Sequence, residues 1–140
     1  MGMAFLSITT HGGRPELGLL AVAVLLGIVH LSWAAVAARR QQSLKWARGP
    51  RDEPMPIHGV AARLDRAFRN YMETFPFFAA AVLLGAETNS LRDVSVWGAH
   101  LYVWSRVLYV PLYAYGSPFR TLVWFASLIG LLMVVAALFI

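Results

Sequence analysis

The sequence is dominated by long apolar runs separated by short polar stretches. Leu17 to Ala38 is almost entirely aliphatic, and a second apolar run extends from about residue 119 to residue 140. Each run has about the 20 residues that an α-helix needs to cross about 30 Å of hydrocarbon. The pattern therefore predicts a membrane-spanning helix at each end of the sequence.

Two further helices are predicted between these runs. Turn-forming residues separate them: Pro50, Pro54 and Pro56 interrupt an ordered or semi-ordered loop over residues 40–56, and Gly116-Ser117-Pro118 forms a tight turn. We therefore expect an all-α, integral membrane four-helix bundle. It would form a single domain over residues 1–140, with helices at about 17–40, 57–86, 92–115 and 118–140.

The composition agrees with a membrane protein. Hydrophobic residues make up 59% of the chain and charged residues only 14%, with a mean hydropathy of +0.60. The sequence has no cysteine, so it offers neither a disulfide nor a thiolate of its own. Any thiol chemistry must use the sulfur of a ligand.

The net charge of +5 is explained by topology rather than by nucleic-acid binding. Five cations gather in one interhelical stretch: Arg39, Arg40, Lys45, Arg48 and Arg51. Because cytoplasmic loops are enriched in Lys and Arg, we place this loop in the cytoplasm and both termini outside. The segment before Leu17 lacks a basic region and a cleavage site, so we expect the first helix to be retained.

The predicted second helix carries an unusual polar stripe. Arg66, Arg69, Asn70 and Glu73 occur at i, i+3, i+4 and i+7, so they share one face of a helix. Pro76 follows, where its missing N–H and its ring favour a kink. Such a helix needs cover from other helices or from a second subunit, because charged groups in lipid are costly.

A second polar face is predicted on the third helix. Tyr102, Arg106, Tyr109 and Tyr113 share it, and Arg120 opens the last helix about one turn farther on. With the stripe on the second helix, these residues can converge in the cytoplasmic half. Guanidinium groups bind carboxylates and a glutamate can bind an ammonium group, so the expected ligand is small, zwitterionic and net anionic. Its co-substrate would be hydrophobic and arrive through the lipid.

Two motifs resemble a known family. The run RAFRNYMETFPFF over residues 66–78 resembles the second-helix signature of the MAPEG family, the membrane-associated proteins of eicosanoid and glutathione metabolism. Its parts are similar to those of the microsomal prostaglandin E synthase and leukotriene C synthase branches. Arg106, Tyr109, Tyr113 and Arg120 independently reproduce a spacing of the leukotriene branch.

The resemblance implies a fold, a partner and a ligand. It implies a homotrimer of four-helix protomers, of a bacterial type and in the inner membrane, with glutathione bound between subunits at the cytoplasmic side. The residues that would bind glutathione are Arg39, Arg66, Arg69, Asn70, Glu73, Arg106, Tyr109 and Tyr113. Arg40 is an alternative to Arg39.

The resemblance also implies an activity. Arg120 would be the catalytic residue, because a fixed cation lowers the pKa of a nearby thiol and so increases the fraction of nucleophilic thiolate. The expected reaction is a glutathione-dependent transferase or peroxidase reaction on a lipophilic electrophile. Membrane lipids and a hydrophobic second substrate are the other expected partners, with no nucleic acid and no metal.

Several other interpretations stay open from the sequence. The stripe on the second helix could be an ion-pair network that only holds an oligomer together, and Arg106 could serve packing rather than a ligand. The protein could bind glutathione or a lipid without catalysis, or be a small multidrug-type transporter, although the first helix lacks a carboxylate after Glu16. We expect His30 and His100 to be core residues with satisfied ring nitrogens.

Overall fold

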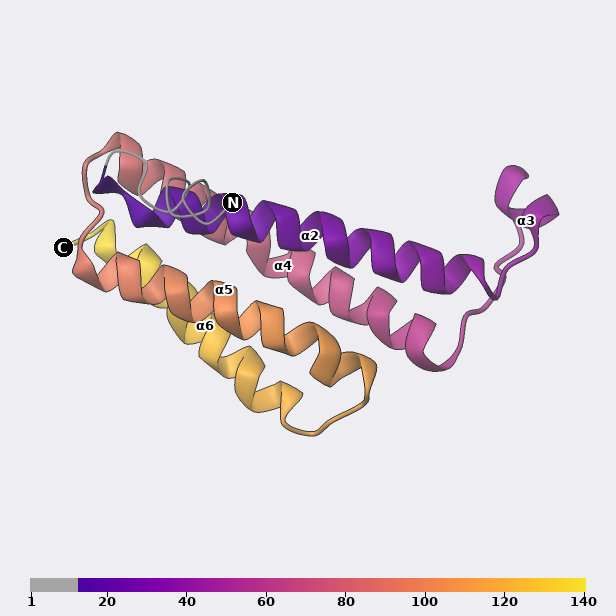
Figure 1. Ribbon diagram of the computed structural model, residues 1–140. Helices are drawn as coiled ribbons and strands as arrows, with labels where there is room; N and C mark the ends of the chain where they lie inside the picture. The colour runs from indigo at the N-terminus through magenta and orange to yellow at the C-terminus, as the bar shows by residue number, and fades with distance from the viewer. Residues whose placement is uncertain (1–12) are drawn as a thin grey trace, which may run out of the picture.

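The computed structural model describes residues 13–140, which form five helices and, within that range, no strand (Figure 1). Four of the helices are long and one is short. Their bounds are Pro15–Arg39 for α2, Leu44–Arg48 for α3, Gly59–Glu87 for α4, Asp93–Ala114 for α5 and Arg120–Ala137 for α6. The described part of the chain is thus all-helical, as predicted. The segment before Leu17, from which we expect the first helix to be retained, consists mostly of residues 1–12 and lies largely outside the described residues.

The long helices run side by side, with α2 beside α4 and α5 beside α6 (Figure 1). The loop that contains α3 and the turn between α5 and α6 lie at the same end of the bundle. The turn between α4 and α5 and the C-terminus lie at the opposite end. This arrangement brings the first half of α4, the last turns of α5 and the first turn of α6 to the end that carries α3.

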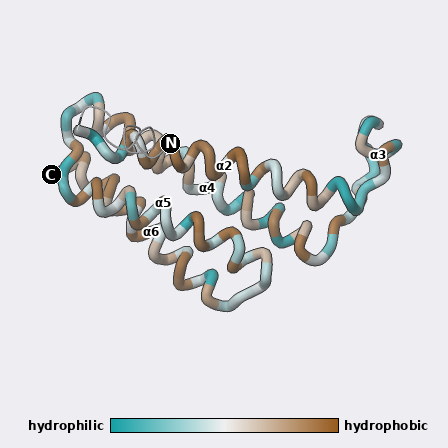
Figure 2. Tube along the Cα trace, in the orientation of Figure 1, coloured by the Kyte–Doolittle hydropathy of each residue, from teal (hydrophilic) through white to brown (hydrophobic). Residues whose placement is uncertain are grey.

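Two of the long helices, α2 and α6, are long and apolar enough to span a membrane. Only 22% of the residues in the apolar stretch of α2 and 28% of those in α6 are buried in the bundle, and Figure 2 shows hydrophobic residues along both helices. On α6 the exposed side chains Leu122, Phe125, Ile129 and Leu132 form a stripe that suits lipid. That α4 and α5 also cross the membrane stays a prediction, which their packing beside α2 and α6 supports.

The interior of the bundle is apolar and aromatic. The rings of Phe78 on α4 and Tyr102 on α5 stack with their centroids 4.1 Å apart, and both side chains are fully buried. His30 on α2 is also buried, against the rings of Phe68 and Tyr71. Neither ring nitrogen of His30 has a partner in the described chain, so the expectation of a satisfied core histidine is wrong here.

The helices α5 and α6 approach most closely where two glycines face each other. A Cβ atom added to Gly130 would lie 2.5 Å from the backbone nitrogen of Tyr102 and 2.6 Å from the carbonyl oxygen of Gly98. Small residues allow such contact between membrane helices, which lack a hydrophobic driving force for association. This contact fixes the position of α6 against α5.

The loop over residues 40–58 contains a short helix, α3, between Gln41 and His58. Its helix α3 was not predicted, although Ser43 caps it by accepting a hydrogen bond from the backbone N–H of Trp46 at 3.2 Å. Gln41 and His58 close the base of the loop with two hydrogen bonds of 3.1 and 2.8 Å. The loop therefore has a defined shape beyond the end of α2 (Figure 1).

Replacing Gly130 by alanine tests the contact between α5 and α6. The added methyl group meets the backbone of α5, which cannot yield, so we expect the free energy of unfolding to fall by about 1–3 kcal/mol. The matched control is Gly27→Ala, whose methyl group would meet a side-chain atom of Tyr71 at 3.1 Å and should cost less. Thermal unfolding in detergent measures both; equal losses would contradict the assigned role of Gly130.

Candidate functional site

A pocket of about 240 Å³ opens between α4, α5 and α6. It lies toward the end of the bundle that carries α3, because Arg120 begins α6 there (Figure 1). The residues that line it are Asn70, Tyr109, Tyr113, Arg120, Thr121 and Trp124. Four of the residues predicted from the sequence to form the site thus share one pocket, although they come from three helices.

One side of the pocket is a stack of aromatic and cationic groups. Tyr109 and Tyr113 are one turn apart on α5, and their rings meet edge to face with centroids 5.4 Å apart. The guanidinium carbon of Arg120 lies 4.5 Å from the centroid of the Tyr113 ring. Such a cation–π contact fixes the arginine without neutralising its charge. The turn before α6 allows this approach because Gly116 adopts a φ of +75°.

Beneath the pocket lies a buried arginine. Arg106 is only 1% exposed; it donates to Asn70 Oδ1 at 2.7 Å and to Thr74 Oγ1 at 2.8 Å. Its guanidinium carbon also lies 5.3 Å from the centroid of the Tyr109 ring. Arg106 was predicted to bind glutathione, but in this chain its terminal nitrogens are already bonded and it does not line the pocket.

Glu73 joins the same network from the outer side of α4. Asn70 Nδ2 donates to Glu73 Oε2 at 3.2 Å. The Glu73 residue as a whole is exposed, so its carboxylate remains accessible to a ligand or to another subunit. The amide of Asn70 therefore lies between a buried cation and an exposed carboxylate.

The remaining cations of the stripe lie outside this pocket. Arg69 pairs with Asp65 at 2.7 Å, and its side chain is 73% exposed. Arg66 is exposed and forms no hydrogen bond or ion pair with the described residues. An exposed ion pair contributes about 0–1 kcal/mol, so Arg69 can exchange Asp65 for another anion at little cost.

Arg39 is not brought to the pocket within one chain. Its guanidinium group donates to the carbonyl oxygens of Gln42 at 3.1 Å and Ser43 at 3.5 Å, next to the end of α2. Arg40 is exposed at the same end. Within a single chain, Arg39 therefore bonds to the loop that follows α2, Arg40 lies beside that loop, and neither residue lines the pocket.

The sequence did not predict how the end of α5 is held. Arg63 Nε donates to the carbonyl oxygen of Ala114 at 2.7 Å, which ties the first turns of α4 to the last turn of α5. A cation suits this place, because the last carbonyl groups of a helix have no partner within the helix. The bond helps to fix the turn that leads to Arg120.

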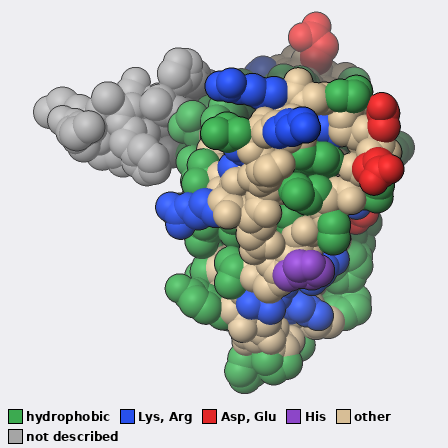
Figure 3. Space-filling model, turned by 90° about the vertical axis from the view of Figure 1, so that its right-hand side faces the viewer, with side chains coloured by type: hydrophobic (Ala, Val, Ile, Leu, Met, Phe, Trp, Pro, Cys, Tyr) green, Lys and Arg blue, Asp and Glu red, His purple; other side chains and the backbone are tan. Residues whose placement is uncertain are grey.

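Cations are spread over this end of the molecule, as Figure 3 shows from that side. They come from the loop, from the start of α4 and from the first residue of α6. An anionic ligand would be attracted to such a surface. Within the described residues no group of three or more His, Asp or Glu side chains that could hold a metal ion occurs.

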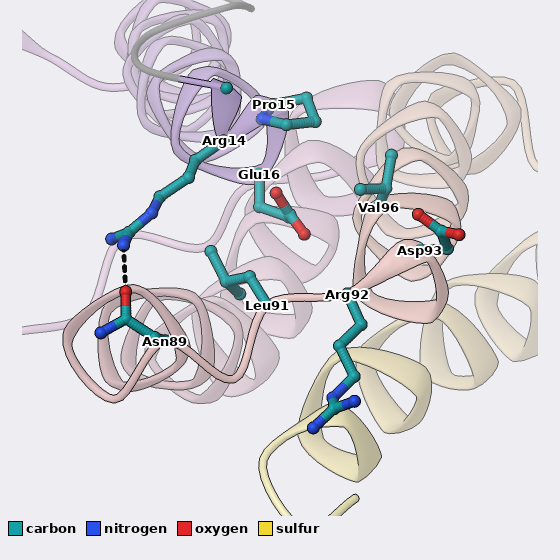
Figure 4. A pocket seen from close by; sticks show the side chains of 9 residues that line it. Arg14, Pro15, Glu16, Asn89, Leu91, Arg92, Asp93 and Val96 are labelled. Atoms are coloured by element: carbon teal, nitrogen blue, oxygen red, sulfur yellow. Dashed lines mark hydrogen bonds between the residues drawn. The ribbon is translucent and has the colours of Figure 1, made fainter.

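A second polar pocket, of about 300 Å³, lies at the opposite end between the starts of α2 and α5 (Figure 4). It is larger, and two of its charged side chains, Arg14 and Glu16, have partners in the chain, whereas the exposed Asp93 forms no side-chain hydrogen bond or ion pair with the described residues. Arg14 donates to Asn89 Oδ1 and to the carbonyl oxygen of Ala86, and Ser95 Oγ is hydrogen-bonded to Glu16. The pocket beside Arg120 suits an anionic ligand better, because its lining includes an arginine and no carboxylate.

A comparison with protein-family models agrees with the family resemblance of the sequence. The model of the MAPEG family matches residues 17–140. The chain belongs to the MAPEG family. Neither the search of curated proteins nor the search of solved structures finds a match. MAPEG membership and the apolar helices identify a membrane protein, and the family indicates a role related to glutathione or eicosanoid metabolism.

Two pocket residues of this MAPEG protein were missed by sequence reasoning. Thr121 and Trp124 follow Arg120 by one and four residues, so the helical period places all three near one side of α6. The indole N–H of Trp124 is buried and has no partner in the described chain. The i, i+4 spacing from Arg120 was the available signal, but a lone tryptophan in an apolar helix is more often a packing residue.

The Arg63 bond makes a direct prediction. Replacing Arg63 by glutamine removes a charged hydrogen bond to the end of α5, so we expect a loss of about 1–2 kcal/mol in the free energy of unfolding. Arg66→Gln, at an exposed position on the same helix, is the matched control and should change stability little. Detergent unfolding followed by circular dichroism distinguishes the two; a larger effect for Arg66 would contradict the proposed role of Arg63.

Proposed function

We propose that this protein is a glutathione-dependent membrane transferase or peroxidase that acts on lipophilic electrophiles. The observation that carries the proposal is the pocket in which Asn70, Tyr109, Tyr113 and Arg120 meet from three helices. Its groups suit a small anionic peptide: a free amide donor, two phenols and a guanidinium without a carboxylate partner among residues 13–140. Because the chain has no cysteine, the reactive thiol would be that of glutathione.

In this proposal Arg120 holds the glutathione sulfur as a thiolate. A fixed guanidinium group near a thiol stabilises the anion and lowers the thiol pKa, which raises the fraction of the nucleophilic form at neutral pH. The contact with the Tyr113 ring keeps Arg120 in place before glutathione binds. In a transferase reaction the thiolate sulfur bonds to the electrophilic carbon and displaces the leaving group. In a peroxidase reaction the sulfur attacks the O–O bond of a hydroperoxide, whose alkoxide takes up a proton and leaves as the alcohol. A second glutathione then converts the resulting sulfenic acid to glutathione disulfide and water.

The exposed charges of α4 support an assembly of several copies, for which we propose the homotrimer. Arg66, Arg69 and Glu73 project from a helix that is packed between apolar helices, where lipid would solvate them poorly. A neighbouring copy that covers this face would satisfy them and could close the pocket. The proposed site would then lie between subunits, with Arg39 of a neighbouring copy as a further cation for the glutathione carboxylates.

The second substrate would come from the membrane. An apolar groove of about 250 Å³ lies between α2 and α4, lined by side chains such as Leu31, Phe68 and Phe75. Its phenol, Tyr71, already donates to the carbonyl oxygen of Ala23. The groove offers few directional polar groups, so it would accept a hydrophobic molecule without selecting a particular one. The cationic end of the bundle is the proposed cytoplasmic side.

A non-catalytic glutathione- or lipid-binding protein is the second candidate. The same pocket would bind the ligand, but Arg120 would not contact the sulfur. The two candidate functions differ in whether bound glutathione is held as a thiolate, and not in how tightly it binds. The predictions below therefore measure binding and thiolate formation separately.

Binding is the first prediction of the proposal. Isothermal titration calorimetry of the detergent-purified protein should detect glutathione binding, and Asn70→Ala should weaken it at least about tenfold because a hydrogen-bond donor is lost. Arg69→Ala and Glu73→Ala should weaken it as well. Arg92→Ala, at the opposite end, is the control and should bind normally. Absence of binding to the unmodified protein would contradict the proposal.

Thiolate formation is the second prediction. Adding glutathione should produce the ultraviolet absorbance of a thiolate, and Arg120→Ala should abolish it while retaining most of the binding. Conjugation of a hydrophobic aryl halide should fall about 100-fold or more in Arg120→Ala, the scale of losing one electrostatic stabiliser. A protein that binds glutathione without thiolate absorbance would favour the non-catalytic candidate.

A further inference from the structure

The amide of Asn70 has a defined direction, which its two neighbours determine. Arg106 Nη1 lies 2.7 Å from one end of the amide, and Glu73 Oε2 lies 3.2 Å from the other end. An arginine can only donate, and an ionised carboxylate can only accept. The oxygen of Asn70 must therefore face Arg106, and its NH₂ group must face Glu73.

This orientation of the amide leaves one N–H of Asn70 free to donate to a ligand. The NH₂ group of Asn70 carries two hydrogens, and Glu73 accepts one of them. No other acceptor among residues 13–140 takes the second, and Asn70 lines the pocket. If the amide were reversed, its oxygen would face the pocket and would repel an anionic ligand.

Packing alone does not explain Arg106. It is 1% exposed, and no carboxylate of the described chain lies within ion-pair distance. Its bonds go to the neutral oxygens of Asn70 and Thr74, and its Nε has no partner within residues 13–140. A buried cation without an anion is costly, and a residue that served packing alone could be apolar.

We propose that Arg106 is a positioning residue: it fixes the direction of the Asn70 amide so that an N–H group faces the pocket. It does not touch the ligand. Thr74 holds the second arm of the guanidinium, and the planar fork of arginine lets one side chain bind both residues of α4 at once. The expected effect on glutathione binding rests on the proposed function. The effect of Arg106 on the orientation of the Asn70 amide can be tested without glutathione.

The chain permits a direct measurement of the Asn70 amide. It contains only two asparagines, Asn70 and Asn89, so selective isotope labelling of asparagine gives two side-chain NH₂ signals in a nuclear magnetic resonance spectrum. Asn89 lies at the opposite end, where its Oδ1 accepts from Arg14, and serves as an internal control. Asn89→Gln removes one signal and so assigns the other.

We expect the Asn70 signal to move or broaden in Arg106→Gln while the Asn89 signal stays unchanged. Arg106→Lys keeps the charge but lacks the two-armed geometry, so it should not restore the Asn70 signal. Thr74→Val leaves both Arg106 and Asn70 in place but removes the second anchor, and it should shift the Asn70 signal in the same direction. This variant carries the test if the Arg106 substitutions do not fold.

Glutathione affinity gives the second, independent readout. Asn70→Ala and Arg106→Gln should each weaken binding about tenfold, and the double variant should be no weaker than either, because both changes remove the same donor. If the two losses in affinity multiplied in the double variant, Arg106 would act on the ligand by itself, and the proposal would be overturned. An unchanged Asn70 signal in Arg106→Gln, or its full restoration by lysine, would also overturn it. Failure of the unmodified protein to bind glutathione would overturn the proposed function, while the spectrum would still decide the role of Arg106.

Discussion

The buried guanidinium group of Arg106 constrains the interior of the bundle. A cation with 1% exposure among apolar helices needs acceptors from the chain itself, and α4 supplies them through Asn70 and Thr74. These residues are one turn apart, so one face of α4 must turn toward α5. The register between the two helices follows from this requirement, and the pocket forms beside it, where α6 completes the wall.

The same orientation of α4 separates two sets of polar residues. Asn70 turns toward the pocket, whereas Arg66, Arg69 and Glu73 stay on or near the outer surface. The inner set can receive a ligand, and the outer set needs a cover when the helix lies in a membrane. In the function that we propose, a neighbouring subunit provides this cover, so binding of glutathione and assembly would depend on the same helix.

The sequence predicts the long helices and part of the candidate site, because the signals for both are local. Long apolar runs and Pro or Gly turns predict the helices, and the helical period places Tyr109 and Tyr113 on one face of α5. Pairing across helices is less predictable: Arg63 bonds to a backbone oxygen of α5, and such a partner depends on the packing of separate segments. The pair of Arg69 with Asp65 is instead a local i, i+4 contact within α4. The helix α3 was missed because three prolines follow it closely and its five residues carry little periodic signal. Trp124 was missed because an isolated aromatic side chain in an apolar helix looks the same whether it packs or lines a pocket.

A structure of the protein determined in a lipid nanodisc with glutathione present would test the central claim most directly. We expect density for glutathione in the pocket between α4, α5 and α6, with its sulfur next to Arg120 and the exposed face of α4 covered by a second copy. Density at the opposite end, beside Arg14 and Glu16, or an unoccupied pocket beside Arg120 at saturating glutathione, would contradict the site that we propose.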